Sequence, residues 1–213
     1  MNLSLILIAL TSYMIGSISG GIIIGKFKNI DIRAKGSKAS GATNALRTMG
    51  IFFAFLVLII DVYKGFFATS YIPSFFLENP CNKTKILAGI FSILGHIYPL
   101  YFKFKGGKGV GTALGTLFAF PSILSFVLTA FISWVIFLAL TGFVGLSSIL
   151  ASLLIPISYF LYADHLINEL LLYSLFIGLL VIFTHRENII RMINRKENQF
   201  KKIMLLNLFK KND

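Results

Sequence analysis

The sequence predicts an all-α protein, a polytopic bundle of helices that cross a membrane. Three observations lead to this fold class. Hydrophobic residues make up 56% of the 213 residues and charged residues only 13%, whereas a soluble domain has about 45–50% apolar and about 25% charged residues. Long stretches carry no charge, and the basic residues are concentrated in short segments between them. This composition excludes a disordered chain, a disulfide-rich secreted scaffold and an ordinary soluble enzyme.

The distribution of the basic residues predicts which loops face the cytoplasm. The net charge is +12, and most lysine and arginine residues fall in the segments 26–50, 103–108 and 185–213. Nucleic-acid binding would explain such a charge in a soluble protein, but here the basic segments alternate with apolar stretches of membrane length. Positive residues accumulate on the cytoplasmic side of membrane proteins. We therefore expect no nucleic-acid partner and place the three segments in the cytoplasm.

The first half of the chain is expected to cross the membrane three times. Residues Asn2 to Gly25 are uncharged, and their basic flank begins after them, at Lys26. This asymmetry predicts a true span with the N-terminus outside rather than a signal peptide. A second span is expected from Ile51 to Leu77 and a third from Ile86 to Phe102, joined by a polar turn at 78–85.

The long uncharged stretch 109–140 is expected to hold two spans. As a single helix it would measure about 48 Å at ~1.5 Å per residue, which is too long for a hydrocarbon layer of ~30 Å. Pro121 divides it into a short span before and a full span after.

Two further spans are expected in the rest of the chain, from Thr141 to Tyr162 and from Leu170 to Thr184, with a turn at Asp164 and His165 between them. An even number of spans must separate the loop at 103–108 from the basic tail 185–213, because both are expected in the cytoplasm. Seven spans in total satisfy this condition, with the C-terminus inside, and five spans are the alternative. We expect one integral membrane domain over residues 1–213, ending in a basic cytoplasmic tail, part of it a helix on the lipid surface.

The first basic loop has a composition suited to binding an anion. Residues 36–47 read GSKASGATNALR. Gly36 and Gly41 allow the backbone to turn its N–H groups inward, and Arg47 offers a planar fork that fits a phosphate. The hydrogen-bonding side chains in this loop are Ser37, Ser40, Thr43 and Asn44. A plain linker remains the alternative interpretation.

The second basic loop, KFKGGKGVGT at 103–112, leads directly into an apolar helix. The backbone amides of Gly106, Gly107 and Gly109, the start of that helix and the Lys108 ammonium could together hold an anion. A nucleotide-hydrolysing loop would need Ser or Thr after the lysine, where this chain has Gly109. The pattern therefore predicts a phosphate site without nucleotide hydrolysis, and simple glycine packing is the alternative.

Two further signals are weaker. His185 and Asn188, in THRENIIR, are three residues apart, which on a helix puts both on one face, able to reach a phosphate or hydroxyl. A histidine that only marks the helix end is the alternative. Asp61 and Lys64 lie inside the second expected span, where charges are costly without partners. They form an ion pair, or Lys64 neutralises an anionic ligand, and the sequence leaves both open.

Taken together and in order, these motifs resemble the membrane acylphosphate:glycerol-3-phosphate acyltransferase family of bacteria (PlsY type). The matching segments are GSISGGIIIGK at 16–26, DIRAKGSKASGATNALRTMG at 31–50, DVYKG at 61–65, GHIYPLYFKFKGGKGVGTALG at 95–115 and HRENI at 185–189. One departure stands out. The family usually reads Gly-Ser-Gly-Asn in the first loop, whereas here Ser37 is followed by Lys38 and Ala39.

The resemblance implies a seven-helix enzyme of the cell membrane with its active site at the cytoplasmic face. Such an enzyme transfers a fatty acyl group from acyl phosphate to the 1-hydroxyl of glycerol 3-phosphate. The products are lysophosphatidic acid and phosphate, the first acylation step of phospholipid synthesis. Its expected partners are these two substrates and the lipid bilayer, with no metal and no cofactor.

The expected site combines the three polar segments. The residues expected in catalysis are Ser37, Arg47, Lys108, His185 and Asn188; those expected to bind substrate or phosphate are Gly36, Gly41, Thr43, Asn44, Gly106, Gly107, Gly109 and Lys64. Acyl phosphate is already activated, and the chain has no G-x-S-x-G motif, so direct attack by the hydroxyl is favoured over an acyl-enzyme. The proton goes to His185 or to the substrate's own phosphate, and a purely orienting role for His185 is the alternative.

Two other functions compete with this interpretation. A membrane transporter of an organic phosphate would also combine a helical bundle with phosphate-binding loops. It would need polar residues along several spans, but the stretch 109–140 offers only Thr, Ser and Trp side chains as polar candidates. A non-catalytic lipid-binding scaffold is the third and weaker alternative.

Overall fold

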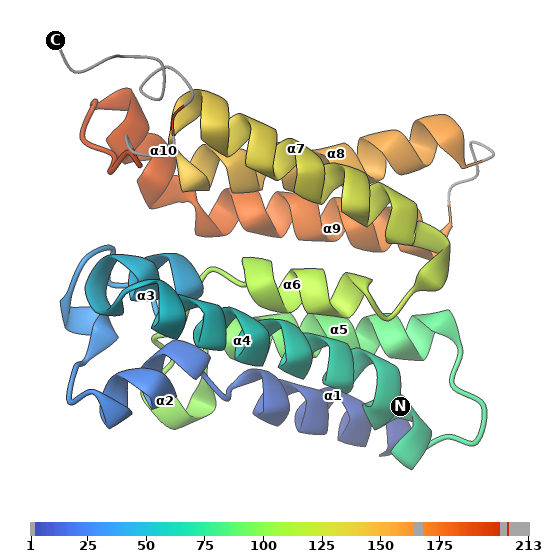
Figure 1. The fold of residues 1–213 in the computed structure, drawn as a ribbon. Helices are drawn as coiled ribbons and strands as arrows, with labels where there is room; N and C mark the ends of the chain where they lie inside the picture. The colour runs from blue at the N-terminus through green and yellow to red at the C-terminus, as the bar shows by residue number, and fades with distance from the viewer. Residues whose placement is uncertain (1–2, 164–167, 201–203, 205–213) are drawn as a thin grey trace, which may run out of the picture. The chain divides into compact units, whose positions relative to one another are not determined.

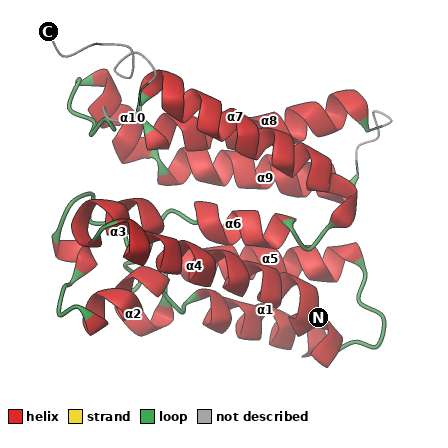
Figure 2. Ribbon diagram, in the orientation of Figure 1, coloured by secondary structure: helices red, strands yellow, loops and turns green. Residues whose placement is uncertain are grey.

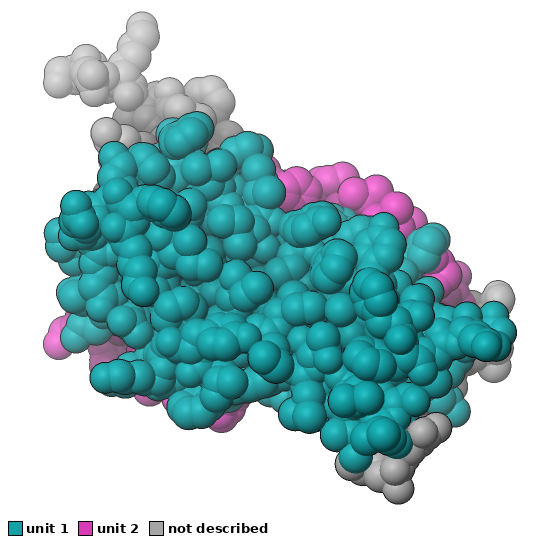
Figure 3. Space-filling view, turned by 90° about the horizontal axis from the view of Figure 1, so that it is seen from below, with its two compact units in different colours: residues 1–121 teal, residues 122–213 magenta. Residues whose placement is uncertain are grey.

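The computed structural model describes residues 3–163, 168–200 and 204, and within them it contains ten α-helices and no strand, as Figure 1 and Figure 2 show. The predicted all-α class is confirmed. The chain divides into two compact units, residues 1–121 and 122–213, which Figure 3 distinguishes by colour. The turn expected at Asp164 and His165, and the part of the expected tail at 201–203 and 205–213, lie outside the described residues.

Unit 1 is built around one long central helix. Its helices are α1 (Leu3–Gly16), α2 (Gly20–Phe27), α3 (Ala42–Met49), α4 (Ile51–Tyr71), α5 (Asn82–Ile97) and α6 (Val110–Leu117). Helix α4 packs against α6, α3, α5 and α2, and α1 packs along α5. The loops beside α2 and α3 and the start of α6 lie at one end of this unit, opposite the N-terminus (Figure 1).

Glycines bring α4 and α6 into backbone contact. A methyl group on Gly65 would overlap the carbonyl of Thr112, and one on Gly115 would overlap the carbonyl of Val62. Small residues that let helix backbones approach closely are typical of helix pairs in membranes. The contact fixes α6, and therefore the loop that precedes α6, against the central helix.

Unit 2 is a second helical bundle with its own core. It contains α7 (Leu124–Thr141), α8 (Val144–Tyr162), α9 (Glu169–Thr184) and α10 (Arg186–Ile193). Helix α8 packs against both α7 and α9. Asn168 is the N-cap of helix α9, and its side-chain oxygen accepts hydrogen bonds of 3.0 Å from the N–H groups of Leu170 and Leu171. This cap satisfies two amides that the first helical turn leaves without a partner.

The prediction of seven spans is not confirmed. Among the described residues, five segments are long and apolar enough to cross a membrane: Leu3–Phe27, Ile51–Phe75, Asn82–Phe102, Pro121–Thr141 and Val144–Tyr162. A sixth is counted if α9 and α10, which meet at a bend of 53°, form one span. The short span expected before Pro121 is only the 8-residue helix α6, about 12 Å at ~1.5 Å per residue. The N-terminus outside and the C-terminus inside remain predictions.

Two boundaries also differ from the expectation. The first expected span, Asn2 to Gly25, is broken between α1 and α2 at 17–19. The expected tail helix ends at Ile193, and residues 194–200 are not helical. Both breaks have a local signal: residues 16–21 read GSISGG, where serine and glycine favour helix ends, and residues 194–199 read NRKENQ, which has no apolar side chain to pack.

Candidate functional site

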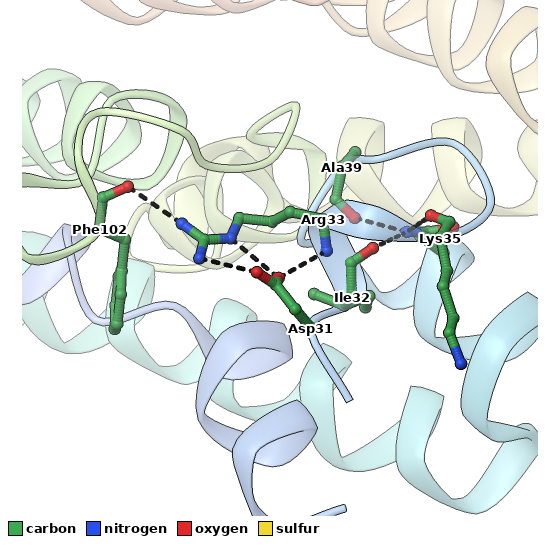
Figure 4. A network of polar contacts seen from close by, with 7 residues as sticks. Asp31, Ile32, Arg33, Lys35, Ala39 and Phe102 are labelled. Atoms are coloured by element: carbon green, nitrogen blue, oxygen red, sulfur yellow. Dashed lines mark hydrogen bonds and ion pairs between the residues drawn. The ribbon is translucent and has the colours of Figure 1, made fainter. Parts of the chain in front are cut away.

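The side chain of Asn44 organises the first basic loop from inside. Asn44 lies in α3 and is 1% exposed. Its Nδ2 lies 2.9–3.0 Å from the carbonyl oxygens of Ile32, Lys35 and Ala39, and its Oδ1 accepts a 2.9 Å hydrogen bond from the N–H of Ser37. Figure 4 shows the three carbonyls turned toward a common point. The polar atoms of Asn44 are thus occupied by loop backbone, which indicates that it shapes the loop around Ser37.

The backbone conformation of this loop explains why position 36 is glycine. It also bears on position 38, where this chain has lysine in place of the family's usual glycine. Gly36 has a φ of +59°, and a methyl group there would overlap Oδ1 of Asn44, so both conformation and space require glycine. Lys38 has the same φ of +59°, a region that non-glycine residues rarely adopt. The position at which the family usually has glycine is therefore left-handed in this chain although it carries a lysine.

Two contacts join the first basic loop, and the turn at 31–35 that precedes it, to the second loop and its preceding residue Phe102. Nη1 of Arg33 donates a 3.3 Å hydrogen bond to the carbonyl of Phe102, and the N–H of Ser40 donates one of 3.3 Å to the carbonyl of Gly106. Asp31 accepts hydrogen bonds of 3.0 Å from Nε and Nη2 of Arg33 (Figure 4). These bonds lower the pKa of Asp31 below its ordinary value and raise that of Arg33. The two loops that the sequence singles out in unit 1 are therefore neighbours.

The glycine loop rests on the end of α5. The N–H of Gly107 donates a 3.1 Å hydrogen bond to the carbonyl of His96. A methyl group on Gly106 would overlap that carbonyl, and one on Gly107 would overlap ring nitrogen Nε2 of His96. Gly109, with a φ of +84°, then forms the N-cap of α6. Lys108 lies between these glycines and is half-buried. The contacts of the glycines therefore hold the backbone from which the Lys108 side chain extends.

A buried cluster of charged side chains lies directly beneath this loop. Nζ of Lys64 lies 2.9 Å from Oδ1 of Asp61, 2.9 Å from Nδ1 of His96 and 2.6 Å from the carbonyl of Ile18. The contact with Asp61 is an ion pair, and the contact with Ile18 is a hydrogen bond that the ammonium donates to a carbonyl. Of the two interpretations left open by the sequence, the structure shows the ion pair. Lys64 contacts acceptors of the chain itself, and through His96 it supports the glycine loop.

His185 and Asn188 lie in unit 2, at the bend between α9 and α10. His185 follows Thr184, the last residue of α9, and is the N-cap of α10, the helix that contains Asn188. Both His185 and Asn188 are buried, at 3% and 4% exposed. Nδ1 of His185 lies 2.8 Å from the carbonyl of Val181. A carbonyl can only accept, so Nδ1 carries the proton and Nε2 is the accepting nitrogen of the neutral ring.

Asn188 has a partner, Glu197, that the sequence does not identify. Nδ2 of Asn188 donates a 2.9 Å hydrogen bond to Oε1 of Glu197, and Nε of Arg191 lies 2.7 Å from the other carboxylate oxygen. Glu197 stands nine residues after Asn188, beyond the end of α10, so no helical spacing connects the two. The opposite charges of Asp31 and Arg33, two residues apart, were the one local signal available for the loop junction.

The described residues combine helices of membrane length with two joined loops that carry cations, hydroxyls and glycines, which points to an integral membrane protein with a site for an anionic ligand. Residues 6–195 match the family model "Glycerol-3-phosphate acyltransferase". The chain belongs to this family and is an acyltransferase. Two curated relatives, both named glycerol-3-phosphate acyltransferase, come from Prochlorococcus marinus (strain MIT 9215) and Bacillus subtilis (strain 168). They are 43% and 42% identical, over 91% and 92% of this chain and 96% and 97% of their own lengths.

Solved structures agree with this assignment. The chain is similar to the crystal structure of PlsY, an integral membrane glycerol 3-phosphate acyltransferase, in its glycerol 3-phosphate form, with a TM-score of 0.82 and 38% identity over 97% of this chain and 100% of that one. The lysophosphatidic acid form gives a TM-score of 0.81 at 36% identity, over 95% and 98% of the two chains. The protein is therefore an integral membrane acyltransferase of the phospholipid-synthesis type.

Proposed function

We propose that this protein transfers a fatty acyl group from acyl phosphate to the 1-hydroxyl of glycerol 3-phosphate, at the cytoplasmic face of the cell membrane. The products are lysophosphatidic acid and inorganic phosphate. The observation that carries the proposal is the junction of the first basic loop with the glycine loop, through Arg33 to Phe102 and Ser40 to Gly106. Support comes from the relatives, which are named for glycerol 3-phosphate, and from the glycerol 3-phosphate and lysophosphatidic acid forms of the similar structure.

The proposed phosphate contacts come from the two joined loops. Arg47 and Lys108, together with Ser37, hold the phosphate groups, because cations and hydroxyls form strong hydrogen bonds with phosphate oxygens. The amides of Gly106, Gly107 and Gly109 add donors at the start of α6. Gly36, Gly41 and Thr43 give the first loop its shape, with Asn44 holding it from inside and Lys64 supporting the second loop through His96.

The proposed chemistry is direct acyl transfer. The 1-hydroxyl oxygen of glycerol 3-phosphate attacks the acyl carbon, a C–O ester bond forms, and the C–O bond to the phosphate breaks. Inorganic phosphate leaves with the electron pair of that bond. The hydroxyl proton passes to Nε2 of His185, which is the accepting ring nitrogen, or to a phosphate oxygen of the substrate. Asn188 helps to position the glycerol phosphate, and no cofactor or metal takes part.

An apolar groove on unit 1 suits the acyl chain. It is a shallow, open hollow of about 480 Å³ with an almost wholly apolar lining, which is the environment that an acyl chain requires. The lining side chains all come from α4 and the end of α6: Leu58, Ile59, Val62, Tyr63, Phe66 and Phe118. The groove therefore shares its two helices with the supported glycine loop.

One assay tests the proposed function. The purified protein in detergent is given acyl phosphate and glycerol 3-phosphate, without acyl-CoA or acyl carrier protein. We expect lysophosphatidic acid and one equivalent of phosphate. A folded preparation that forms no product would contradict the proposal. Uptake of an organic phosphate into reconstituted vesicles would then support the transporter alternative, and lipid binding without uptake would support a scaffold.

Replacement of His185 by glutamine separates its two proposed roles. The glutamine side chain could still form hydrogen bonds with a substrate but could not take up a proton. If His185 is the base, the variant loses turnover at saturating substrate, by about 10²–10⁴-fold. Near-normal turnover with a raised KM for glycerol 3-phosphate would remove His185 as the base and leave it an orienting role.

A further inference from the structure

We propose that Arg33 is a positioning residue of this acyltransferase, which holds the turn that leads into the glycine loop. The inference rests on the proposed function, in which the backbone amides of that loop contact a phosphate. Arg33 belongs to the turn at 31–35, and its guanidinium contacts two groups of unit 1, the carboxylate of Asp31 and the carbonyl of Phe102. Neither Asp31 nor Phe102 is among the residues proposed to bind substrate.

The carboxylate of Asp31 fixes the direction of the guanidinium group. Nε and Nη2 of Arg33 donate hydrogen bonds of 3.0 Å to the two carboxylate oxygens, and the backbone N–H of Arg33 donates one of 3.0 Å to Oδ1. A guanidinium is planar and rigid, so a carboxylate bound to two of its nitrogens also fixes the third. That third nitrogen, Nη1, lies 3.3 Å from the carbonyl oxygen of Phe102 (Figure 4).

The carbonyl of Phe102 closes a turn with an unfavourable backbone. It also accepts a 3.2 Å hydrogen bond from the N–H of Lys105, and the two residues in between, Lys103 and Phe104, have φ values of +57° and +58°. A left-handed conformation is unfavourable for residues with a side chain, and it persists where surrounding contacts enforce it. Arg33 supplies such a contact from outside the turn.

This turn determines how the chain enters the glycine loop. Directly after Lys105, the carbonyl of Gly106 accepts a 3.3 Å hydrogen bond from the N–H of Ser40, and the N–H of Gly107 donates one of 3.1 Å to the carbonyl of His96. These bonds join backbone groups and hold the middle of the loop. Arg33 holds the residue before the loop through a side chain, so substitution can remove this attachment while the other two remain.

The proposed role depends on the shape of the guanidinium and not on its charge. The carboxylate of Asp31 balances the charge of Arg33, whereas Arg47 and Lys108 are the cations proposed for the phosphate. Lysine keeps the positive charge but lacks the planar fork that can bind a carboxylate and a carbonyl at once. A positioning role and a direct role in binding phosphate therefore predict different outcomes for the same substitutions.

Steady-state kinetics with two substitutions separate these roles. We expect Arg33→Lys to lower kcat/KM for glycerol 3-phosphate by roughly 10- to 100-fold, chiefly through a raised KM, because small displacements of a binding group have effects of this size. Asp31→Asn should change KM in the same direction, because the guanidinium is no longer fixed. If Arg33 bound phosphate itself, Arg33→Lys would keep most of the activity and Asp31→Asn would lower the KM by releasing the cation. Either of these results would overturn the inference.

A double mutant and a matched control complete the kinetic test. In an Arg33→Lys background, Asp31→Asn should add no further loss, because the two residues act as one unit; independent, multiplicative losses would contradict this. Lys35→Gln is the control, since it removes a positive charge from the end of the same turn and its exposed side chain extends away from the network (Figure 4). Its kcat/KM should stay near that of the wild type. An equal loss in Lys35→Gln would show that the charge of the turn matters and not the contact of Arg33.

Hydrogen–deuterium exchange tests the contact without turnover. The N–H groups of Phe104 and Lys105 close the turn through hydrogen bonds to the carbonyls of Pro99 and Phe102. We expect the segment 102–108 to exchange several-fold faster in Arg33→Lys, with the rest of unit 1 unchanged, and at the wild-type rate in Lys35→Gln.

The exchange measurement also separates this inference from the proposed function. If the wild type forms no lysophosphatidic acid, the proposed function fails while the exchange of the segment 102–108 still tests the contact. Unchanged exchange of this segment in Arg33→Lys would overturn the role of Arg33 even in an active enzyme. Faster exchange over the whole of unit 1 would show that Arg33 supports the fold in general, and this result would overturn the positioning role as well.

Discussion

Gly107 lies against the ring of His96 with no space for a side chain between them. The N–H of Gly107 donates a 3.1 Å hydrogen bond to the His96 carbonyl. A methyl group on the Cα of Gly107 would overlap Nε2 of the His96 ring. Nδ1, on the other side of the ring, lies 2.9 Å from the ammonium of Lys64. The glycine loop is therefore seated on a side chain that is itself held by a buried ion pair.

Replacement of Gly107 by Ala should disturb this seat. The added methyl group forces the loop or the ring to move, and overpacking of this kind costs about 1–3 kcal/mol. We expect a lower thermal midpoint in detergent and a raised KM for glycerol 3-phosphate. Gly111→Ala is the control, because its methyl group would meet Cβ of Asp61 at an ordinary 3.4 Å. A Gly107→Ala variant as stable and active as Gly111→Ala would contradict the close contact.

Removal of either proposed phosphate cation should slow the reaction strongly. We expect Arg47→Ala and Lys108→Ala each to lower kcat/KM by roughly 10²–10³-fold, the usual effect of losing one donor that stabilises developing charge. Lys105→Ala serves as the control, because this exposed lysine belongs to the same loop and shares its charge but not the proposed contact. Wild-type activity in both Arg47→Ala and Lys108→Ala would show that the site lies elsewhere.

Asn44→Ala should unfold the first basic loop rather than weaken a ligand contact. The variant deprives the carbonyls of Ile32, Lys35 and Ala39 of a shared donor, and each buried polar group left without a partner costs about 1–3 kcal/mol. We expect a lower thermal midpoint that added glycerol 3-phosphate does not restore. Thr48→Ala, one turn later in α3, loses only a bond to the carbonyl of Asn44 and should remain close to wild-type stability.

The lysine at position 38 should be less favourable than the family's usual glycine. A left-handed conformation costs about 1–2 kcal/mol for an L-residue, and Lys38 adopts it with a φ of +59°. Glycine and alanine both remove the charge, but only glycine adopts this φ without strain. We therefore expect Lys38→Gly to be more stable than Lys38→Ala by about 1 kcal/mol in thermal unfolding. Equal stability would show that the loop relaxes to another backbone conformation.

The carboxyl group of Asp31 should titrate below its ordinary pKa because Arg33 donates hydrogen bonds to it. Its stabilising effect on the folded loop is then fully present above the ordinary value of about 3.9, and it is lost as the pH falls through the lowered value. A ¹³C titration of the Asp31 carboxyl should show this midpoint. In Arg33→Gln the midpoint should return toward the ordinary value; a midpoint unchanged by the substitution would assign the shift to another group.

Much of the architecture follows from local properties of the sequence. Apolar length predicts the helices that cross the membrane, and charge sorting predicts the basic loops, because both depend on the nearest residues alone. The Gly-rich and hydroxyl-bearing motifs likewise identify the two loops that meet in unit 1. The ion pair between Asp61 and Lys64 was foreseen as one of two possibilities, since residues three apart on a helix are neighbours.

The contacts that shape the site depend instead on how distant segments fold back. Asn44 contacts the backbone at residues 32, 35, 37 and 39. The sequence of the loop does not distinguish an asparagine amide that faces a ligand from one that faces the loop backbone. Glu197 meets Asn188 only because the chain reverses after Ile193 and attaches to the corner at Thr141. The sequence also does not show that α6 ends at Leu117, because residues 118–120 are as apolar as the helix itself.

The ion pair within α4 has a consequence for the biogenesis of the protein. Each charge that enters the centre of a bilayer costs about 2.5–3.5 kcal/mol on insertion scales. Asp61 and Lys64 belong to the same helix, one turn apart, so they can neutralise each other before α5, which carries His96, follows along the chain. Helix α4 therefore brings no net charge to this level of the bilayer, and its ion pair meets the carbonyl of Ile18 from the preceding segment and the ring of His96 from the following helix.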